Sequence, residues 1–125
     1  MRVFDSNILI YHLNDVLPPA AFASVEAWIS EGAMISVITR IEVLGYPQTD
    51  DQFQQAAHLL AYFDEIPLHE PIAQRTITLR QQSRIRLPDA LIAATALYLG
   101  FPLVSRNTHD FRAIEELIIL NPFDE

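Results

Sequence analysis

The chain has 125 residues, of which half are hydrophobic and 19% are charged, a composition that excludes a disordered protein. It contains no cysteine, which excludes disulfides, thiolate metal sites and a cysteine nucleophile. Its formal net charge is −8, so any binding of nucleic acid must depend on local arginines or bound cations. Its apolar runs fall short of the ~20 residues that cross a bilayer, and its N-terminus lacks the layout of a signal peptide. We therefore expect a cytoplasmic protein with no membrane segment.

Strands and helices are predicted to alternate along the chain. Short apolar segments predict strands at residues 2–5, 34–36, 66–68, 103–105 and 117–120. Proline starts, glycine stops and helical spacing predict helices at residues 7–13, 19–31, 38–44, 53–63, 71–84, 88–99 and 108–114. The helix at 53–63 is expected to take its N-terminal cap from Asp50 or Asp51. This alternation predicts an α/β fold, with a parallel sheet and helices on both of its faces, in one domain spanning residues 1–125.

Several polar residues follow predicted strands or occur beside apolar residues. Asp5 ends the first strand, and Glu42 is expected on the inward side of the helix after the second strand. Asp89 lies in the first turn of the most apolar predicted helix, while Asn107 and Asp110 follow the fourth strand. In open parallel sheets, ligands bind outside the carboxyl ends of the strands. These side chains are therefore the candidates for a functional site.

Each acidic residue also has an ordinary structural interpretation. Asp5, Asp89 or Asp110 could cap a helix, and Glu42 could lie on an exposed helix face. Together they favour another interpretation, because carboxylates held close in a partly buried cleft take up protons unless a cation lies among them. A cluster of oxygen ligands without cysteine or paired histidines suits Mg²⁺ or Mn²⁺ rather than Zn²⁺. Such an ion activates water and neutralises charge on a phosphoryl group.

All eight basic residues are arginines, and several fall in one short stretch that contains no acidic residue. The general interpretation of such a stretch is a solvated helix face. The alternative is an edge that holds phosphate, since the planar guanidinium group suits phosphate oxygens. We take Arg80, Arg84 and Arg86 as the candidates for such contacts.

Four segments of the chain resemble the motifs of PIN domains and occur in the order seen in that family: VFDSNILIY, ISVITRIEVLGY, LPDALIAATALYLG and LVSRNTHDF. They run from Val3 to Phe111 and are most similar to the VapC group of toxins. The resemblance implies a three-layer α/β/α fold with a central five-stranded parallel sheet. It also implies cleavage of RNA phosphodiester bonds by metal-activated water, as the toxin of a type II toxin–antitoxin pair.

Carried over residue by residue, the resemblance implies catalytic roles for four acidic residues: Asp5, Glu42, Asp89 and Asp110. Of these, Asp5 and Asp89 would bind Mg²⁺ or Mn²⁺, directly or through water, and the other two would hold outer water molecules. Ser6 and Asn107 would orient the ligands by hydrogen bonds. The fourth family position varies, so it is left open whether Asn107 or Asp110 lies nearer the ion.

The resemblance also implies partners. The substrate would be RNA, and Arg80, Arg84 and Arg86 are the candidate contacts for its backbone. Family members dimerise through their first helices and the long helix after the glutamate, so we expect a homodimer that buries part of 22–29 or 53–63. A small VapB-like antitoxin is expected to insert an arginine among the carboxylates, where its charge competes with the metal.

Other classes of function fit the sequence less well. A haloacid-dehalogenase-like phosphatase needs a second aspartate at the position of Asn7, and a receiver domain depends on a lysine that this chain lacks. The three glycines offer no phosphate-binding loop. Two alternatives are left open: a catalytically silent PIN-like binding module and a nuclease that acts mainly on DNA. The acidic set looks intact, which favours an enzyme over the silent module.

Overall fold

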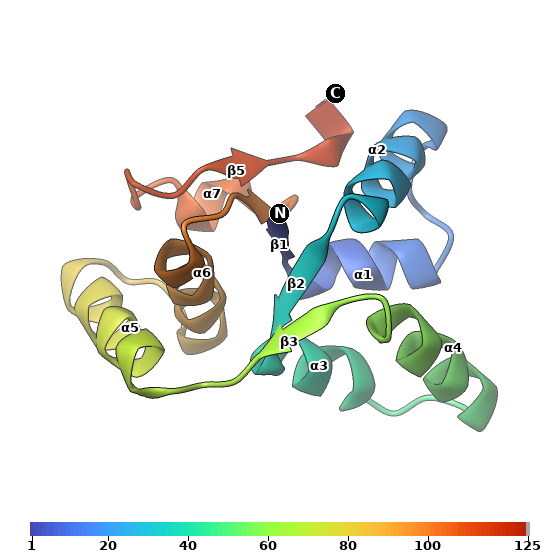
Figure 1. Ribbon diagram of the computed structural model, residues 1–125, viewed down its shortest axis with the longest axis horizontal. Helices are drawn as coiled ribbons and strands as arrows, with labels where there is room; N and C mark the ends of the chain where they lie inside the picture. Colours follow the sequence, from blue (N-terminus) through green and yellow to red (C-terminus); the bar gives the residue numbers. More distant parts are fainter. Residues whose placement is uncertain (125) are drawn as a thin grey trace.

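The computed structural model describes residues 1–124 and contains a five-stranded parallel sheet with the strand order β3-β2-β1-β4-β5 (Figure 1). The strands are β1 (Arg2–Phe4), β2 (Ala33–Ser36), β3 (Asp64–Ile66), β4 (Leu103–Val104) and β5 (Ile119–Leu120). Val3 pairs with Met34 of β2 on one side and with Leu103 of β4 on the other. The first strand of the chain therefore lies at the centre of the sheet, and the predicted five-stranded parallel α/β fold is confirmed.

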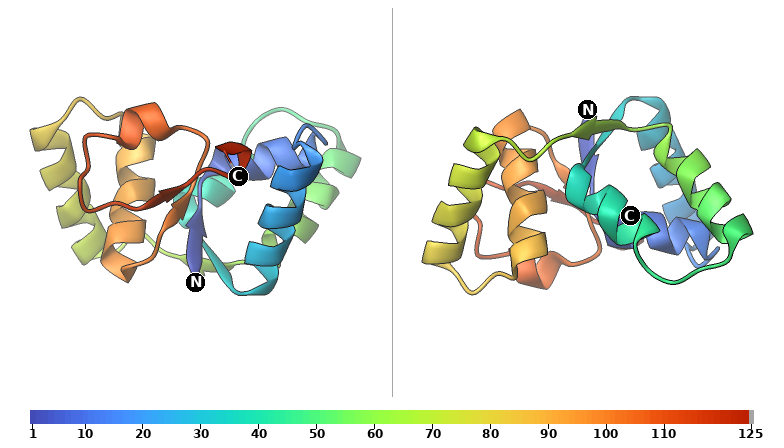
Figure 2. Two further views of the ribbon diagram at one scale, coloured as in Figure 1. Left: turned by 90° about the horizontal axis from the view of Figure 1, so that it is seen from above. Right: turned by 90° about the horizontal axis from the view of Figure 1, so that it is seen from below.

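Helices cover both faces of this sheet, giving three layers (Figure 2). The helices are α1 (Ser6–Leu13), α2 (Pro19–Ser30), α3 (Val37–Leu44), α4 (Asp50–Leu60), α5 (Glu70–Gln82), α6 (Leu87–Leu99) and α7 (Thr108–Phe111), followed by the 3-10 turn η1 (Pro122–Asp124). Side chains alternate along β1, so Val3 packs with α5 and α6 while Phe4 packs with α1, α2 and α4. No helix within residues 1–124 has the length and apolar character to cross a bilayer.

Helix α6 packs between α5 and the sheet. Every residue from Asp89 to Ala96 is buried, which explains why this segment is apolar on nearly every side. Pro88 lies in its first turn, where a missing N–H costs nothing. Gly100 ends the helix in the left-handed conformation, with φ of 74°. The predicted central position of this helix is therefore confirmed.

The predicted cap of α4 and the predicted bounds of the third strand are both wrong. The N-cap of α4 is Thr49 rather than Asp50 or Asp51, because Thr49 and Gln52 form a reciprocal capping box with N–H to oxygen distances of 3.0 and 3.1 Å. The third strand is Asp64–Ile66 rather than 66–68. Pro67 directly follows it, and a proline has no N–H to donate to a neighbouring strand. The apolar residues of the segment therefore lie partly after the strand.

Candidate active site

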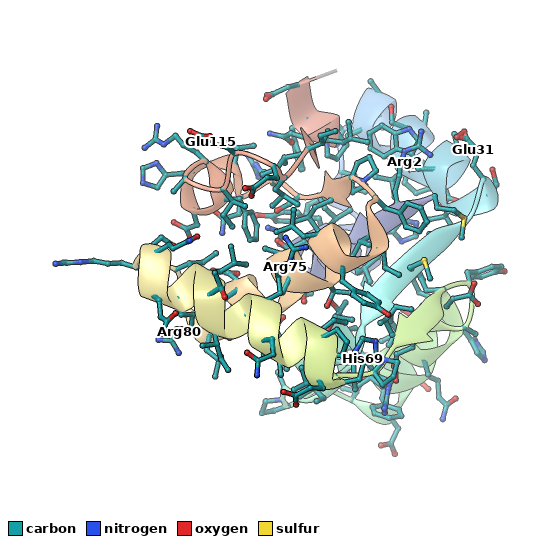
Figure 3. The ribbon with its side chains drawn as sticks, turned by 60° about the vertical axis from the view of Figure 1, so that its left-hand side comes forward. Arg2, Glu31, His69, Arg75, Arg80 and Glu115 are labelled. Atoms are coloured by element: carbon teal, nitrogen blue, oxygen red, sulfur yellow. The ribbon has the colours of Figure 1, made fainter. Side chains whose placement is uncertain are left out.

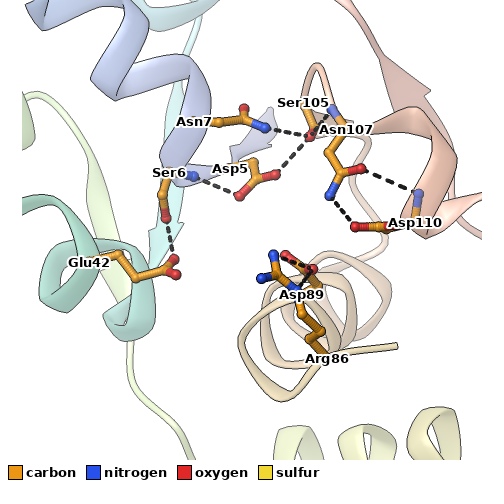
Figure 4. Close-up of polar contacts among 9 residues, drawn as sticks. All are labelled: Asp5, Ser6, Asn7, Glu42, Arg86, Asp89, Ser105, Asn107 and Asp110. Atoms are coloured by element: carbon orange, nitrogen blue, oxygen red, sulfur yellow. Dashed lines mark hydrogen bonds and ion pairs between the residues drawn. The ribbon is translucent and has the colours of Figure 1, made fainter. Parts of the chain in front are cut away.

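A pocket of about 510 Å³ opens where β1, β2 and β4 end, and we call it the acid pocket. Its lining includes three of the four predicted catalytic residues and both predicted supporting residues: Asp5, Glu42, Asp89, Ser6 and Asn107. Figure 4 shows these side chains approaching one another from different elements of the fold. Five of the predicted site residues therefore lie around one pocket, whereas Asp110 is not part of its lining.

Asp5 occupies the junction between β1 and α1 and is only 5% exposed. The N–H of Ser6 donates to Oδ1 and the hydroxyl of Ser105 donates to Oδ2, each at 2.7 Å. Burial raises the pKa of Asp5 to about 6, and the nearby charges of Asp89 and Glu42 act in the same direction against these two hydrogen bonds. Asp5 thus caps α1, as its ordinary interpretation proposed, and is also a buried carboxylate in the pocket.

Glu42 reaches the pocket from the exposed side of α3, so its predicted place on the inward side of that helix is wrong. The buried residues of α3 are Thr39 and Val43, which lie four apart, while Ile41 is 55% exposed. The hydroxyl of Ser6 donates to Oε1 of Glu42 at 2.5 Å. Ser6 therefore connects the carboxylates of Glu42 and Asp5, since its N–H donates to Asp5.

Asp89 lies in the first turn of α6 and pairs with Arg86. Nε and Nη2 of Arg86 both lie 3.3 Å from Oδ2 of Asp89. Burial raises the pKa of Asp89; the charge of Arg86 and its hydrogen bonds oppose this, and the charge of Asp110 adds to it. Arg86 lines the acid pocket, whereas Arg80 and Arg84 are exposed outside it, and Figure 3 shows Arg80 on α5.

Asn107 and Asp110 both belong to the segment after β4. Oδ1 of Asn107 accepts the N–H of Asp110 at 3.3 Å, which caps α7, and Nδ2 of Asn107 donates to Oδ2 of Asp110 at 2.9 Å. Asn107 is among the residues that line the pocket, while Asp110 is not. Asn107 is therefore the nearer of the two to the cavity. Asp110 accepts a hydrogen bond from Asn107, and its charge raises the pKa of Asp89.

Sequence reasoning missed two members of the site, Ser105 and Asn7. Besides donating to Asp5, the hydroxyl of Ser105 accepts the N–H of Asn107 at 3.0 Å and the amide of Asn7 at 3.5 Å. Oδ1 of Asn7, a residue of the pocket lining, is buried without a hydrogen-bond partner among the described residues. The available signal was that Ser105 is a polar residue at the end of β4. This position indicates a contact with Asp5 only when β4 is known to lie beside β1.

The polar groups of the acid pocket fit a hydrated cation. Within residues 1–124 no three aspartate, glutamate or histidine side chains lie close enough to bind one ion together. Mg²⁺ suits such a site, because it keeps several water molecules and binds through one or two carboxylates. The raised pKa values of Asp5 and Asp89 and the unpaired oxygen of Asn7 indicate a place where a positive charge would be stabilised.

Comparison with known proteins agrees with this geometry. The PIN domain profile matches residues 2–117. Ribonuclease VapC10 of Mycobacterium tuberculosis is 34% identical over 122 residues, which cover 94% of this chain and 90% of that protein. A toxin–antitoxin complex from Klebsiella pneumoniae contains a chain that is 35% identical, with a TM-score of 0.81 and 98% of each chain covered. FitAcB from Neisseria gonorrhoeae, at 23% identity, shares the fold with a TM-score of 0.83 over 100% of both chains. The chain therefore belongs to the PIN-domain family and is a VapC-like member of it.

Proposed function

We propose that this protein is a Mg²⁺-dependent endoribonuclease whose chemistry takes place in the acid pocket. The observation that carries the proposal is the meeting of Asp5, Glu42 and Asp89 around one pocket, with the pKa of Asp5 raised to about 6. The identity of 34% to a protein named as a ribonuclease supports RNA as the substrate. A catalytically silent binding module would have no need to keep these carboxylates together against their repulsion.

The residues of the pocket have separate tasks in this proposal. Asp5 and Asp89 hold the cation, which when bound lowers the pKa of a water molecule and neutralises charge on the phosphate. Ser6 and Ser105 fix both oxygens of Asp5, so that its carboxylate is already oriented before the ion arrives. Glu42, held by the Ser6 hydroxyl, orients water at the exposed side of the pocket. Asn107, which lines the pocket, holds the carboxylate of Asp110 by a hydrogen bond.

Arg86 is proposed as the contact for an RNA phosphate near the scissile bond. It is the only basic residue among the described residues that line the acid pocket. Its side chain is 75% exposed, and its two bonds to Asp89 are long, at 3.3 Å. In a protein of net charge −8, a single arginine at the pocket gives the RNA backbone a local attraction that the whole surface does not provide. Arg80 and Arg84 are proposed to contact the backbone farther from the cut.

The proposal includes a protein partner and a role as a toxin. The Klebsiella pneumoniae structure, which is 35% identical to this chain, is of a toxin–antitoxin complex. We therefore propose a small antitoxin as the partner of this chain. An arginine of that partner would pair with the carboxylates as Arg86 pairs with Asp89 here, and would compete with the cation for them.

The test is RNA cleavage by Asp5→Asn beside the wild type, with Mg²⁺ and with EDTA. We expect the wild type to cut RNA only with the metal, and Asp5→Asn to be slower by more than roughly 100-fold, because even outer-shell partners of a metal contribute 10- to 100-fold. Asp15→Asn is the matched control, since Asp15 is exposed in a turn at φ of 57°, a conformation that asparagine tolerates.

Circular dichroism should show the same fold for all three proteins. Undiminished cleavage by Asp5→Asn would remove the acid pocket from the mechanism. Tight Mn²⁺ binding by a wild type that cuts no RNA would instead establish the silent binding module.

A further inference from the structure

A second pocket of about 360 Å³ adjoins the acid pocket, and Tyr46 lines both. It lies between the end of α1, the loop after α3 and the start of α4. All seven of its lining residues are neutral, and four of them carry side-chain amides: Asn14, Gln48, Gln52 and Gln55. We call it the amide pocket. Its composition contrasts with the acid pocket beside it, where four of the lining residues are charged.

Two of the four amides shape the wall of this pocket. Nε2 of Gln48 donates to the carbonyl oxygens of Val43 and Leu44 at 3.4 and 3.3 Å, which fixes the loop after α3. Oε1 of Gln52 accepts the N–H of Thr49 at 3.0 Å in the capping box of α4. Both side chains are therefore held by the backbone around them, and they give the pocket a defined form before any ligand binds.

The other two amides are free to bind a ligand. Asn14, the residue that follows α1, and Gln55 of α4 are both exposed, and neither makes a side-chain hydrogen bond to another residue within 1–124. Each presents a donor and an acceptor together, the combination that pairs with the edge of a nucleobase. Tyr46 is 41% exposed and lines both pockets, and an exposed aromatic ring is the kind of group on which a nucleobase stacks.

We propose that the amide pocket binds one base of the RNA, in a nucleotide next to the scissile phosphate, and that Asn14 and Gln55 determine which base is preferred. This inference rests on the proposed function, because it places the phosphate in the adjoining acid pocket. A phosphate group fits the amide pocket poorly, since no cation lines it. A base is neutral, so it enters this part of an acidic protein without electrostatic repulsion.

The experiment compares the wild type with Asn14→Leu and Gln55→Met, which keep the approximate size of each side chain and remove its amide. A pool of short RNAs with a random central segment is cut in Mg²⁺, and the ends are sequenced to obtain the base preference at each position beside the cut. Gln54→Met is the matched control, because Gln54 is an exposed neighbour on α4 that lines neither pocket. In parallel, binding of labelled short homopolymers of A, C and U is measured in EDTA, where cleavage does not occur.

We expect the wild type to prefer one base at one position beside the cut. A bidentate contact to a base discriminates by roughly 5- to 150-fold, so each of the two variants should lose at least about fivefold of that preference while Gln54→Met keeps it. The same loss should appear among the homopolymers. An unchanged base preference in both variants, or a wild type without any base preference, would overturn this inference. RNA cleavage in the same experiment would still support the proposed function. Amide-dependent binding of homopolymers by a protein that cuts no RNA would uphold the base site and overturn the nuclease.

Discussion

The ionised carboxylate of Asp5 lowers the stability of the folded protein, because it is buried. Its carboxylate is 5% exposed, and burial together with Asp89 and Glu42 raises its pKa from 3.8 to about 6. A raised pKa means that the folded state binds the proton more tightly than the unfolded state, so ionisation at neutral pH opposes folding. A shift of this size corresponds to about 3 kcal/mol. A bound cation would offset this cost, and its absence leaves the metal-free protein less stable than its packing alone would allow.

We therefore expect Asp5→Asn to be more stable than the wild type in EDTA at pH 7–8. The sign follows from the two pKa values: the cost is absent below about pH 4, grows as the pH rises from 3.8 to 6, and is complete above that. Urea unfolding at several pH values measures the difference. Ser105→Ala removes a hydrogen bond that lowers the pKa of Asp5, so the pKa of Asp5 should be higher in this variant. The fall in the stability of Ser105→Ala with rising pH should therefore continue to a higher pH than in the wild type. A stability difference between Asp5→Asn and wild type that stays constant from pH 4 to pH 8 would contradict this account.

The sequence predicted the acidic residues of the site better than their surroundings. Asp5 and Asp89 could be recognised because a charged residue among apolar ones needs a reason. The direction of Glu42 was predicted wrongly, because Ile38 and Ile41 suggested an inward face, while the buried residues of α3 are Thr39 and Val43. Ser105 could not be assigned, since its partner Asp5 lies 100 positions away and no local pattern connects them.

Among the helices, α6 shows how one residue sets a boundary. Gly100 ends this buried helix at φ of 74°, and a Cβ added there would meet no atom within 4 Å. A side chain would therefore fit at this position, but the backbone conformation favours glycine. We expect Gly100→Ala to lower the free energy of unfolding by about 1 kcal/mol through strain alone. Gly100→Asn should lose less, because asparagine adopts this conformation more readily. Thermal unfolding of both variants checks this, and equal losses would show that strain is not the cause.

The type and order of the elements could be read from the sequence, whereas their exact ends and neighbours could not. Helix α6 was recognisable because apolar residues continue around all of its sides. The cap of α4 was assigned to an aspartate although Thr49 holds it, since several residues in that stretch can accept an N–H. Strand order is set by packing between distant segments, so the local patterns that predicted five strands did not predict that β1 lies at the centre of the sheet.

At the scale of the whole molecule, the two segments predicted to form a homodimer meet on one surface. A hollow of about 480 Å³ is lined by residues of α1, α2 and α4 together with Tyr62, which is 73% exposed. We expect the protein to be a dimer in light scattering and Tyr62→Glu to be a monomer, because a charge at a buried interface is costly. Tyr98→Glu, at a 47% exposed tyrosine of α6, should remain dimeric. A monomeric wild type, or a dimer that tolerates Tyr62→Glu, would count against this surface.

The central place of β1 in the sheet has a consequence for synthesis of the protein. Asp5 is translated early, but the strand that pairs with β1 on its other side and the serine that fixes Asp5 come about a hundred residues later. A growing chain on the ribosome thus contains Asp5 and Glu42 before it contains β4 and Ser105. Under the proposed function, cleavage of RNA by the nascent polypeptide begins only after residues 103–107 have emerged, so the order of the strands in the sheet delays the onset of activity.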